Sequence, residues 1–159
     1  MKRWTLSKHD SAGLIEKIEA SLDLKLNLAK SSQASCEEPS EGIVFTHFDN
    51  VVFVQAGGSF FPFLGSQEAL SLFPSALVDE GAIKFLLNGA DVMRPGVKSY
   101  DQWGGAGKTV VVREEKKNRA IVVSRSTLKS EEMTTISKGT CLKNIHHVGD
   151  EYWNAYKTV

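Results

Sequence analysis

The N-terminal third of the chain carries two different spacings of apolar residues. The first spacing has intervals of three and four residues, follows two candidate N-cap residues, Ser7 and Asp10, and predicts an amphipathic helix. Its apolar positions are Leu14, Ile15, Ile18 and Leu22. From Leu22 to Leu28, leucines alternate with polar residues, and this period of two predicts a half-buried strand. A further short strand is predicted before the helix, at Lys2–Leu6.

Residues 31–75 are dominated by turn signals. Ser31–Gly42 is polar, serine-rich and acidic, which predicts an exposed loop. The apolar runs Ile43–Phe48 and Val51–Val54 flank Asp49-Asn50, a dipeptide that tolerates the backbone of a tight hairpin. In the aromatic run 60–64, Pro62 excludes a central strand. Finally, Ser66 is placed to cap a short helix over Gln67–Phe73 that ends at Pro74.

The second half alternates short apolar runs with turn residues. The pattern predicts one helix at Gly81–Leu87, a loop over 98–107 and a helical turn at Ser130–Ile136. The predicted strands are Leu77–Asp79, Val92–Arg94, Thr109–Arg113, Ala120–Arg125, Cys141–His146 and Tyr152–Thr158. Many short strands with frequent turns are typical of a small barrel with few helices.

Composition narrows the class of protein. A hydrophobic share of 42% with 24% charged residues excludes a disordered chain, a collagen-like fibre and a coiled coil. The longest apolar runs are far shorter than a membrane helix, and no apolar stretch of secretory type follows the basic N-terminus. Two cysteines cannot form a disulfide framework. We therefore expect a soluble, cytoplasmic protein with no membrane partner.

The net charge of zero hides an uneven distribution. Residues 1–75 carry 6 Lys and Arg against 9 Asp and Glu, whereas residues 76–159 carry 13 against 10. Within 81–129 the count is 10 basic against 4 acidic residues. This asymmetry is consistent with an ordinary solvated face, and it also suits a surface that meets a polyanion.

Two motifs suggest chemistry but fail on their spacing. Gly104–Thr109 ends in Gly-Lys-Thr like a phosphate-binding loop, but Gln102 stands where the motif needs its first glycine, and a strand pattern follows. Cys141, His146 and His147 match no zinc spacing, and adjacent histidines of a strand point to opposite faces. No nucleophile motif is present, and the carboxylate pairs lie in polar loops. We therefore expect no catalytic site, metal or cofactor.

The segment 81–98 offers a better candidate, for a binding site. Gly89 and Gly96 would let the backbone approach a ligand closely, and Lys84, Arg94 and Lys98 could pair with phosphates. Asn88 is placed to contact a base edge.

This segment resembles the signature of the PUA domain, an RNA-binding pseudo-barrel found in archaeosine transglycosylase, pseudouridine synthases and several translation proteins. The resemblance rests on residues 78–82, 89–93 and 95–97, and on residues 137–139 and 144–153 near the C-terminus. It implies an RNA groove formed by the helix, the following glycine loop and strand, and the last strand. The implied RNA-binding residues are Lys84, Asn88, Gly89, Ala90, Asp91, Arg94, Pro95, Gly96, Lys98 and His146, with His147 as the alternative to His146. Ala82, Phe85, Met93 and Ile145 would belong to the core.

The aromatic run 60–64, a short helix and then Val78–Phe85 extend the resemblance to the family of the malignant T-cell amplified sequence protein and its archaeal relatives. The short length leads us to expect an archaeal-type member. In that family an α/β domain precedes the PUA domain, and the eukaryotic member acts in translation with the small ribosomal subunit and density-regulated protein.

The sequence therefore predicts an α+β protein of two small domains: a pre-PUA-like α/β domain over 1–75 and a mainly-β PUA pseudo-barrel over 76–159. The expected function is non-catalytic binding of structured RNA in translation, either the acceptor end of tRNA or ribosomal RNA. Two alternatives stay open at this point. One is an RNA-targeting accessory module for a tRNA or rRNA modification enzyme carried on another chain, and the other is a protein-interaction module.

Overall fold

A computed structural model of the chain describes residues 1–29 and 31–159. It divides them into two compact units, Met1–Leu72 with Glu151–Val159, and Phe73–Asp150. The predicted boundary at residue 75 thus lies close to the start of the second unit. The last nine residues, which we expected in the C-terminal domain, group with the first unit.

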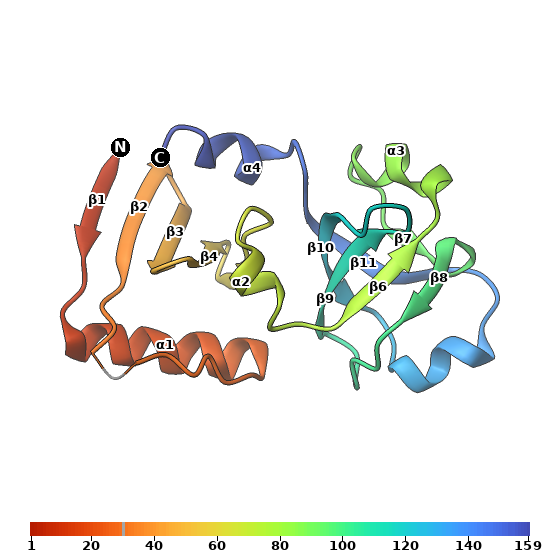
Figure 1. The fold of residues 1–159 in the computed structure, drawn as a ribbon, viewed down its shortest axis with the longest axis horizontal. Coiled ribbons are helices and arrows are strands. Elements are labelled where there is room, and N and C mark those ends of the chain that lie inside the picture. The colour runs from red at the N-terminus through yellow and green to blue at the C-terminus, as the bar shows by residue number, and fades with distance from the viewer. Residues whose placement is uncertain (30) are drawn as a thin grey trace. The chain divides into compact units, whose positions relative to one another are not determined.

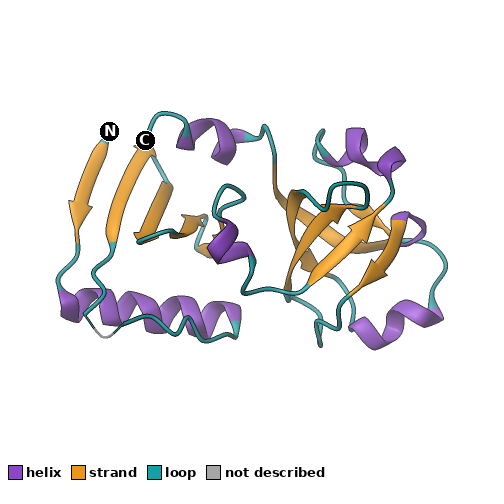
Figure 2. Cartoon of the chain, viewed as in Figure 1, coloured by secondary structure: helices purple, strands orange, loops and turns teal. Residues whose placement is uncertain are grey.

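The first unit is a five-stranded antiparallel sheet with the strand order β1-β2-β3-β4-β5 (Figure 1). Its helices are α1, α2 and the C-terminal α4, shown in purple in Figure 2. The bounds of these elements are β1 (Lys2–Thr5), α1 (Lys8–Leu22), β2 (Ser35–Ser40), β3 (Ile43–Phe48), β4 (Val51–Ala56), β5 (Ser59–Pro62), α2 (Gln67–Leu70) and α4 (Glu151–Tyr156).

Several predictions for this unit are confirmed. The Ser7 hydroxyl accepts the Asp10 N–H at 3.0 Å and caps α1, and the Ser66 hydroxyl caps α2 in the same way. The β3–β4 hairpin turns at Asp49, which has a left-handed φ of 55°. Pro62 ends β5, an edge strand. Proline is tolerated there because one side of an edge strand needs no ladder hydrogen bond.

Two predictions for residues 22–42 are wrong. Leu22–Leu28 forms no strand, because Asp23 and Asn27 adopt left-handed φ values of 53° and 55° and break the extended backbone. The polar segment expected as a loop contains β2 instead. This strand lies between β1 and β3 and buries Cys36. Pairing with strands on both sides outweighs the low strand propensity of its residues.

The C-terminal segment predicted as a strand, Tyr152–Thr158, is also different, because α4 is a helix. Tyr156 lies four positions after Tyr152 and three after Trp153, spacings that bring both residues to the helical face of Tyr156. Tyr156 stacks on Phe63 with ring centroids 4.2 Å apart, and Tyr152 meets Phe61 at 5.1 Å. These ring contacts fix the helix against the sheet of the first unit.

The second unit is a six-stranded sheet with the order β7-β11-β10-β9-β6-β8, in which only β6 and β9 pair in parallel. Its elements are β6 (Ser75–Val78), η1 (Glu80–Ala82), α3 (Ile83–Leu86), β7 (Val92–Met93), η2 (Arg94–Gly96), β8 (Val97–Tyr100), β9 (Thr109–Glu114), β10 (Ala120–Ser126), η3 (Ser130–Thr135) and β11 (Thr140–His147). Together the two units confirm the predicted α+β class.

The core of the second unit consists of valines from β9 and β10 with Val78, Leu86, Met133 and Leu142. Part of the segment predicted as loop 98–107 is the edge strand β8, which pairs with β6 and buries Val97. The glycine-rich run before β9 leads into a strand, as the apolar residues that follow the run predicted. Among the described residues no helix has the length and the apolar composition to cross a membrane.

Candidate nucleic-acid interface

The turn after α3, residues 87–91, is called the glycine loop below. Its backbone folds back on the helix, because the N–H groups of Gly89 and Ala90 donate to the carbonyls of Leu86 and Phe85. Gly89 has a φ of +92°, a conformation that side chains rarely adopt, so glycine is required there by the backbone itself.

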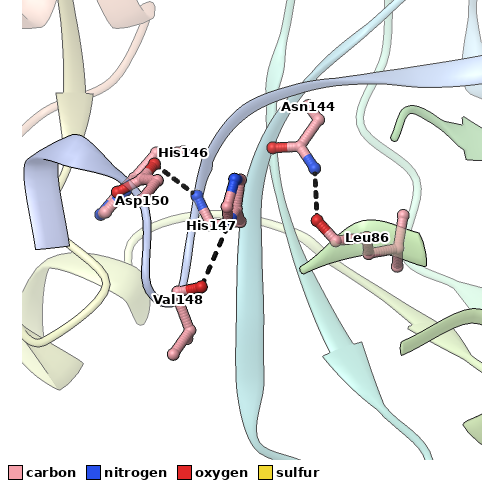
Figure 3. A network of polar contacts seen from close by, with 6 residues as sticks. All are labelled: Leu86, Asn144, His146, His147, Val148 and Asp150. Carbon is pink, nitrogen blue, oxygen red and sulfur yellow. Dashed lines mark hydrogen bonds and ion pairs between the residues drawn. The ribbon is translucent and has the colours of Figure 1, made fainter. Parts of the chain in front are cut away.

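The side chain of Asn144, on β11, holds the glycine loop and the end of α3 in place (Figure 3). Its side-chain amide donates to the carbonyl of Leu86 at 3.0 Å and to that of Ala90 at 2.9 Å. Its backbone N–H donates to the Asp91 carboxylate at 2.9 Å. The candidate residue Asp91 is thus an anchor of the loop, and the three bonds fix the loop on β11.

The two histidines at the end of β11 differ in their accessibility. His146 is fully buried, and its Nδ1 lies 2.9 Å from the Asp150 carboxylate (Figure 3). His147 is half-buried, and its Nε2 lies 3.8 Å from the position that a Cβ on Gly89 would occupy. The structure therefore places His147, and not the candidate His146, beside the glycine loop.

A bulge in β11 explains this placement. Val123 pairs with His146 and Ser124 pairs with Asn144, so Ile145 is an extra residue without a partner on β10. Asn144 and His147, three residues apart, oppose Ser124 and Val122 and therefore share one face of the sheet. Simple alternation places residues three apart on opposite faces.

Helix α3 presents Lys84 and Phe85 to solvent next to the glycine loop. Phe85 is 58% exposed and Met93 48% exposed, so the prediction that both belong to the core is wrong. The Lys84 ammonium lies 5.1 Å from the centre of the Phe85 ring. An exposed aromatic face beside a cation is a surface on which an unpaired base can stack.

Arg94 is occupied within the fold. Its Nε donates to the Met133 carbonyl at 2.8 Å, and its Nη1 to the Val97 carbonyl at 3.4 Å. Pro95 and Gly96 form η2 beside it, and the Gly96 carbonyl accepts the Asp79 N–H. These three candidate residues therefore shape the connection between β7 and β8.

Lys98 is exposed on β8, at the other end of the sheet order from β7. The structure brings Lys84, Asn88, Gly89, Ala90 and Asp91 together in α3 and the glycine loop, whereas Lys98 lies on a separate element of the sheet. We define the candidate interface as Lys84 and Phe85, the glycine loop, Asn144 and His147.

A second cationic feature lies on the opposite face of the sheet from Asn144. Arg125 and Lys143 are direct cross-strand partners on β10 and β11. No carboxylate in residues 1–29 or 31–159 forms an ion pair with either of them. Like charges placed directly opposite each other destabilise a sheet unless an anion neutralises them.

Cys141 does not provide a reactive thiol. It is fully buried, and burial raises its pKa to about 11, although the nearby Arg94 charge opposes this shift. Its Sγ donates to the Val92 carbonyl at 3.4 Å. A thiol with this pKa is protonated at neutral pH and is a poor nucleophile or metal ligand.

Sequence reasoning missed Asn144 and Phe85 as site residues. Asn144 stands between Lys143 and Ile145 in an ordinary strand pattern, and only the register of β11 brings it to the glycine loop. The sequence predicts one helix over Gly81–Leu87, with Phe85 in its apolar stripe. The observed α3 is a single turn that follows a 3₁₀ turn, so a regular helical face does not extend over these residues and Phe85 is left exposed.

Comparison with known proteins gives the family. The PUA domain matches residues 74–148. Malignant T-cell-amplified sequence 1-B of Xenopus laevis is 33% identical over 123 residues, which cover 75% of this chain and 67% of that protein. Translation machinery-associated protein 20 of Schizosaccharomyces pombe is 31% identical over 140 residues, 77% of this chain and 70% of that protein.

An uncharacterized protein of Methanocaldococcus jannaschii is 44% identical over 78 residues, and this match spans about half of each protein, 49% of this chain and 48% of the relative. Among solved structures, a hypothetical protein of Pyrococcus horikoshii superimposes with a TM-score of 0.77 at 26% identity, over 96% of this chain and 98% of the other. These matches confirm the resemblance seen in the sequence. The chain belongs to the family of PUA-domain proteins that includes malignant T-cell-amplified sequence 1 and translation machinery-associated protein 20.

Proposed function

We propose that this protein binds structured RNA of the translation apparatus without catalysing a reaction, and that the RNA lies on the candidate interface. The observation that carries the proposal is the anchoring of the glycine loop by Asn144, with Lys84 and Phe85 exposed on the helix before the loop and His147 beside Gly89. A loop fixed in advance loses little entropy when a ligand binds.

The ligand we propose is the acceptor end of tRNA or an element of ribosomal RNA. An unpaired RNA end offers bases that can stack and hydrogen-bond, which suits an interface with one aromatic face and few cations. One relative is named translation machinery-associated protein 20, and another is named malignant T-cell-amplified sequence 1-B. The family resemblance adds two proposed partners, the small ribosomal subunit and a protein resembling density-regulated protein.

Fluorescence-anisotropy titration with labelled tRNA tests the proposal. The tRNA is used intact and trimmed of its 3′-terminal CCA, at low and at physiological salt. We expect tight binding of intact tRNA and a clear loss on trimming. Binding that ignores trimming would redirect the proposal to ribosomal RNA, and the absence of tRNA and ribosomal-subunit binding at low salt would overturn it.

A further inference from the structure

His147 carries a ring nitrogen whose chemical role is fixed by its neighbour. Its Nδ1 lies 3.0 Å from the Val148 carbonyl (Figure 3). A carbonyl oxygen only accepts hydrogen bonds, so Nδ1 must carry the proton. In the neutral imidazole the other nitrogen, Nε2, then presents a lone pair and acts as an acceptor.

This acceptor has no partner within the part of the chain that the structure describes, residues 1–29 and 31–159. It faces the glycine loop, where a Cβ on Gly89 would come within 3.8 Å of it. The missing side chain at Gly89 therefore leaves open the space in front of Nε2. The backbone N–H of His147 donates to Asp150 at 2.8 Å, and this bond holds the residue in place.

We propose that His147 is a specificity-determining residue that accepts a hydrogen bond from the exocyclic amino group of an unpaired RNA base lying over Gly89. The inference rests on the proposed function. Adenine and cytosine carry such an amino group on the edge used for pairing, whereas uracil presents a carbonyl there. Each of the three bases of a CCA end carries an exocyclic amino group. Any one of these bases could therefore donate a hydrogen bond to His147 Nε2 if it lies over the glycine loop.

The ribose 2′-hydroxyl is the other donor that RNA offers, and the experiment separates the two sources. The probes are three hairpins with the same stem. One ends in a CCA tail, one carries purine and pyrimidin-2-one in place of adenine and cytosine, and one has a 2′-deoxy CCA tail. The amine-deleted tail removes the donor and introduces no new one.

Each hairpin is titrated against the wild-type chain, His147→Phe and His147→Gln, with His9→Phe as a matched control at an exposed histidine of α1. We expect the wild type to prefer the CCA tail over the amine-deleted tail by about threefold to tenfold, the range of one hydrogen bond. His147→Phe should bind both tails alike. His147→Gln should keep part of the preference, because its amide oxygen accepts, and His9→Phe should keep all of it.

The coupling between residue and tail is a readout that a merely structural role of His147 would leave unchanged. Full preference for the amine tail in both His147→Phe and His147→Gln would overturn the inference. So would coupling to the 2′-deoxy tail alone. A wild-type chain that binds all tails equally refutes the role of His147 and leaves RNA binding standing, whereas a wild-type chain that binds no tRNA, ribosomal subunit or hairpin refutes both.

Discussion

Two regions of the second unit are rich in basic residues, and they use them in opposite ways. In the turn between β9 and β10, Lys116 pairs with Glu80 at 2.7 Å and Arg119 pairs with Glu114 at 3.1 Å. Arg113 donates to the Asn118 carbonyl and to the Ser75 hydroxyl. At the candidate interface, the ammonium of Lys84 meets no carboxylate among the described residues, and only an aromatic ring lies beside it.

The comparison shows that the number of cations does not locate a binding surface. The turn contributes much of the basic excess counted over residues 81–129, yet two of its cations, Lys116 and Arg119, are already paired with carboxylates. The Glu80 carboxylate also holds the pKa of Lys116 above its ordinary value, so that ammonium is stabilised within the protein itself. A surface that binds a polyanion keeps its cations without internal partners.

The largest effect that sharpens this contrast is expected at Asn144. Asn144→Ala removes both side-chain donors to the Leu86 and Ala90 carbonyls and loosens the glycine loop, which keeps only the bond from the backbone N–H of residue 144 to Asp91. The loss of two hydrogen bonds, one to a part-buried and one to an exposed carbonyl, costs about 1–2 kcal/mol of unfolding free energy. We expect RNA affinity to fall by at least about tenfold, because the loop must then be ordered on binding.

Denaturant unfolding and anisotropy measure the two losses. The matched control is Arg119→Ala, which breaks a contact of similar length in the turn and should leave RNA affinity unchanged. Equal losses of affinity in the two variants would contradict the contrast between the regions.

The next effect is expected at Phe85. Because its ring is 58% exposed, Phe85→Ala should leave the melting temperature nearly unchanged. If a base stacks on this ring, its loss costs about 1–3 kcal/mol of binding free energy, which is a fivefold to 150-fold weaker affinity. Phe85→Tyr keeps the ring and is the control. Quenching of 2-aminopurine in an unpaired RNA tail reports stacking directly, and unchanged quenching with the alanine variant would remove Phe85 from the interface.

A smaller effect concerns the salt dependence of binding. Lys84→Gln removes a cation of the candidate interface that no carboxylate in the described residues neutralises, whereas Lys143→Gln removes an equally unpaired cation outside that interface. For single-stranded RNA the slope of log affinity against log salt should shrink by about 0.7 for each phosphate that the variant no longer neutralises. Lys116→Gln removes a cation that is already paired and should leave the slope unchanged. A slope that shrinks equally in all three variants would mean that paired and unpaired cations contribute alike.

The elements predicted correctly from the sequence are those whose signals are local. The cap at Ser7 and the turn at Asp49 act over a few residues, and both appear where the sequence places them. The errors fall where distant partners decide. β2 forms because it pairs with β1 on one side and with β3 on the other. The helix α4 packs its aromatic side chains against aromatic side chains of β3 and β5.

The same distinction holds for the interface. The glycine loop was predictable because glycine readily adopts a positive φ, as Gly89 does here. This preference depends only on the residue and its near neighbours. The choice between His146 and His147 depends on the bulge at Ile145, and the role of Asn144 depends on the register of β11 against the loop. No pattern within the strand itself encodes either feature.

The smallest expected effect tests the turn alone. Glu114 accepts the Lys117 N–H and pairs with Arg119, and together these contacts hold the pKa of its carboxyl below the usual 4.5 although burial opposes them. A carboxyl whose pKa is lowered in the folded state stabilises the protein above its unfolded-state pKa, and this contribution is lost as the pH falls through the lower, folded-state value. Glu114→Gln should therefore reduce the melting temperature at about pH 7 and converge with the wild type as the pH falls below the lowered, folded-state pKa of Glu114. RNA affinity at neutral pH should not change, since the turn between β9 and β10 lies outside the candidate interface. Thermal unfolding across this range checks the convergence, and a variant that stays equally destabilised at acid pH would show that the carboxylate charge contributes nothing to the turn.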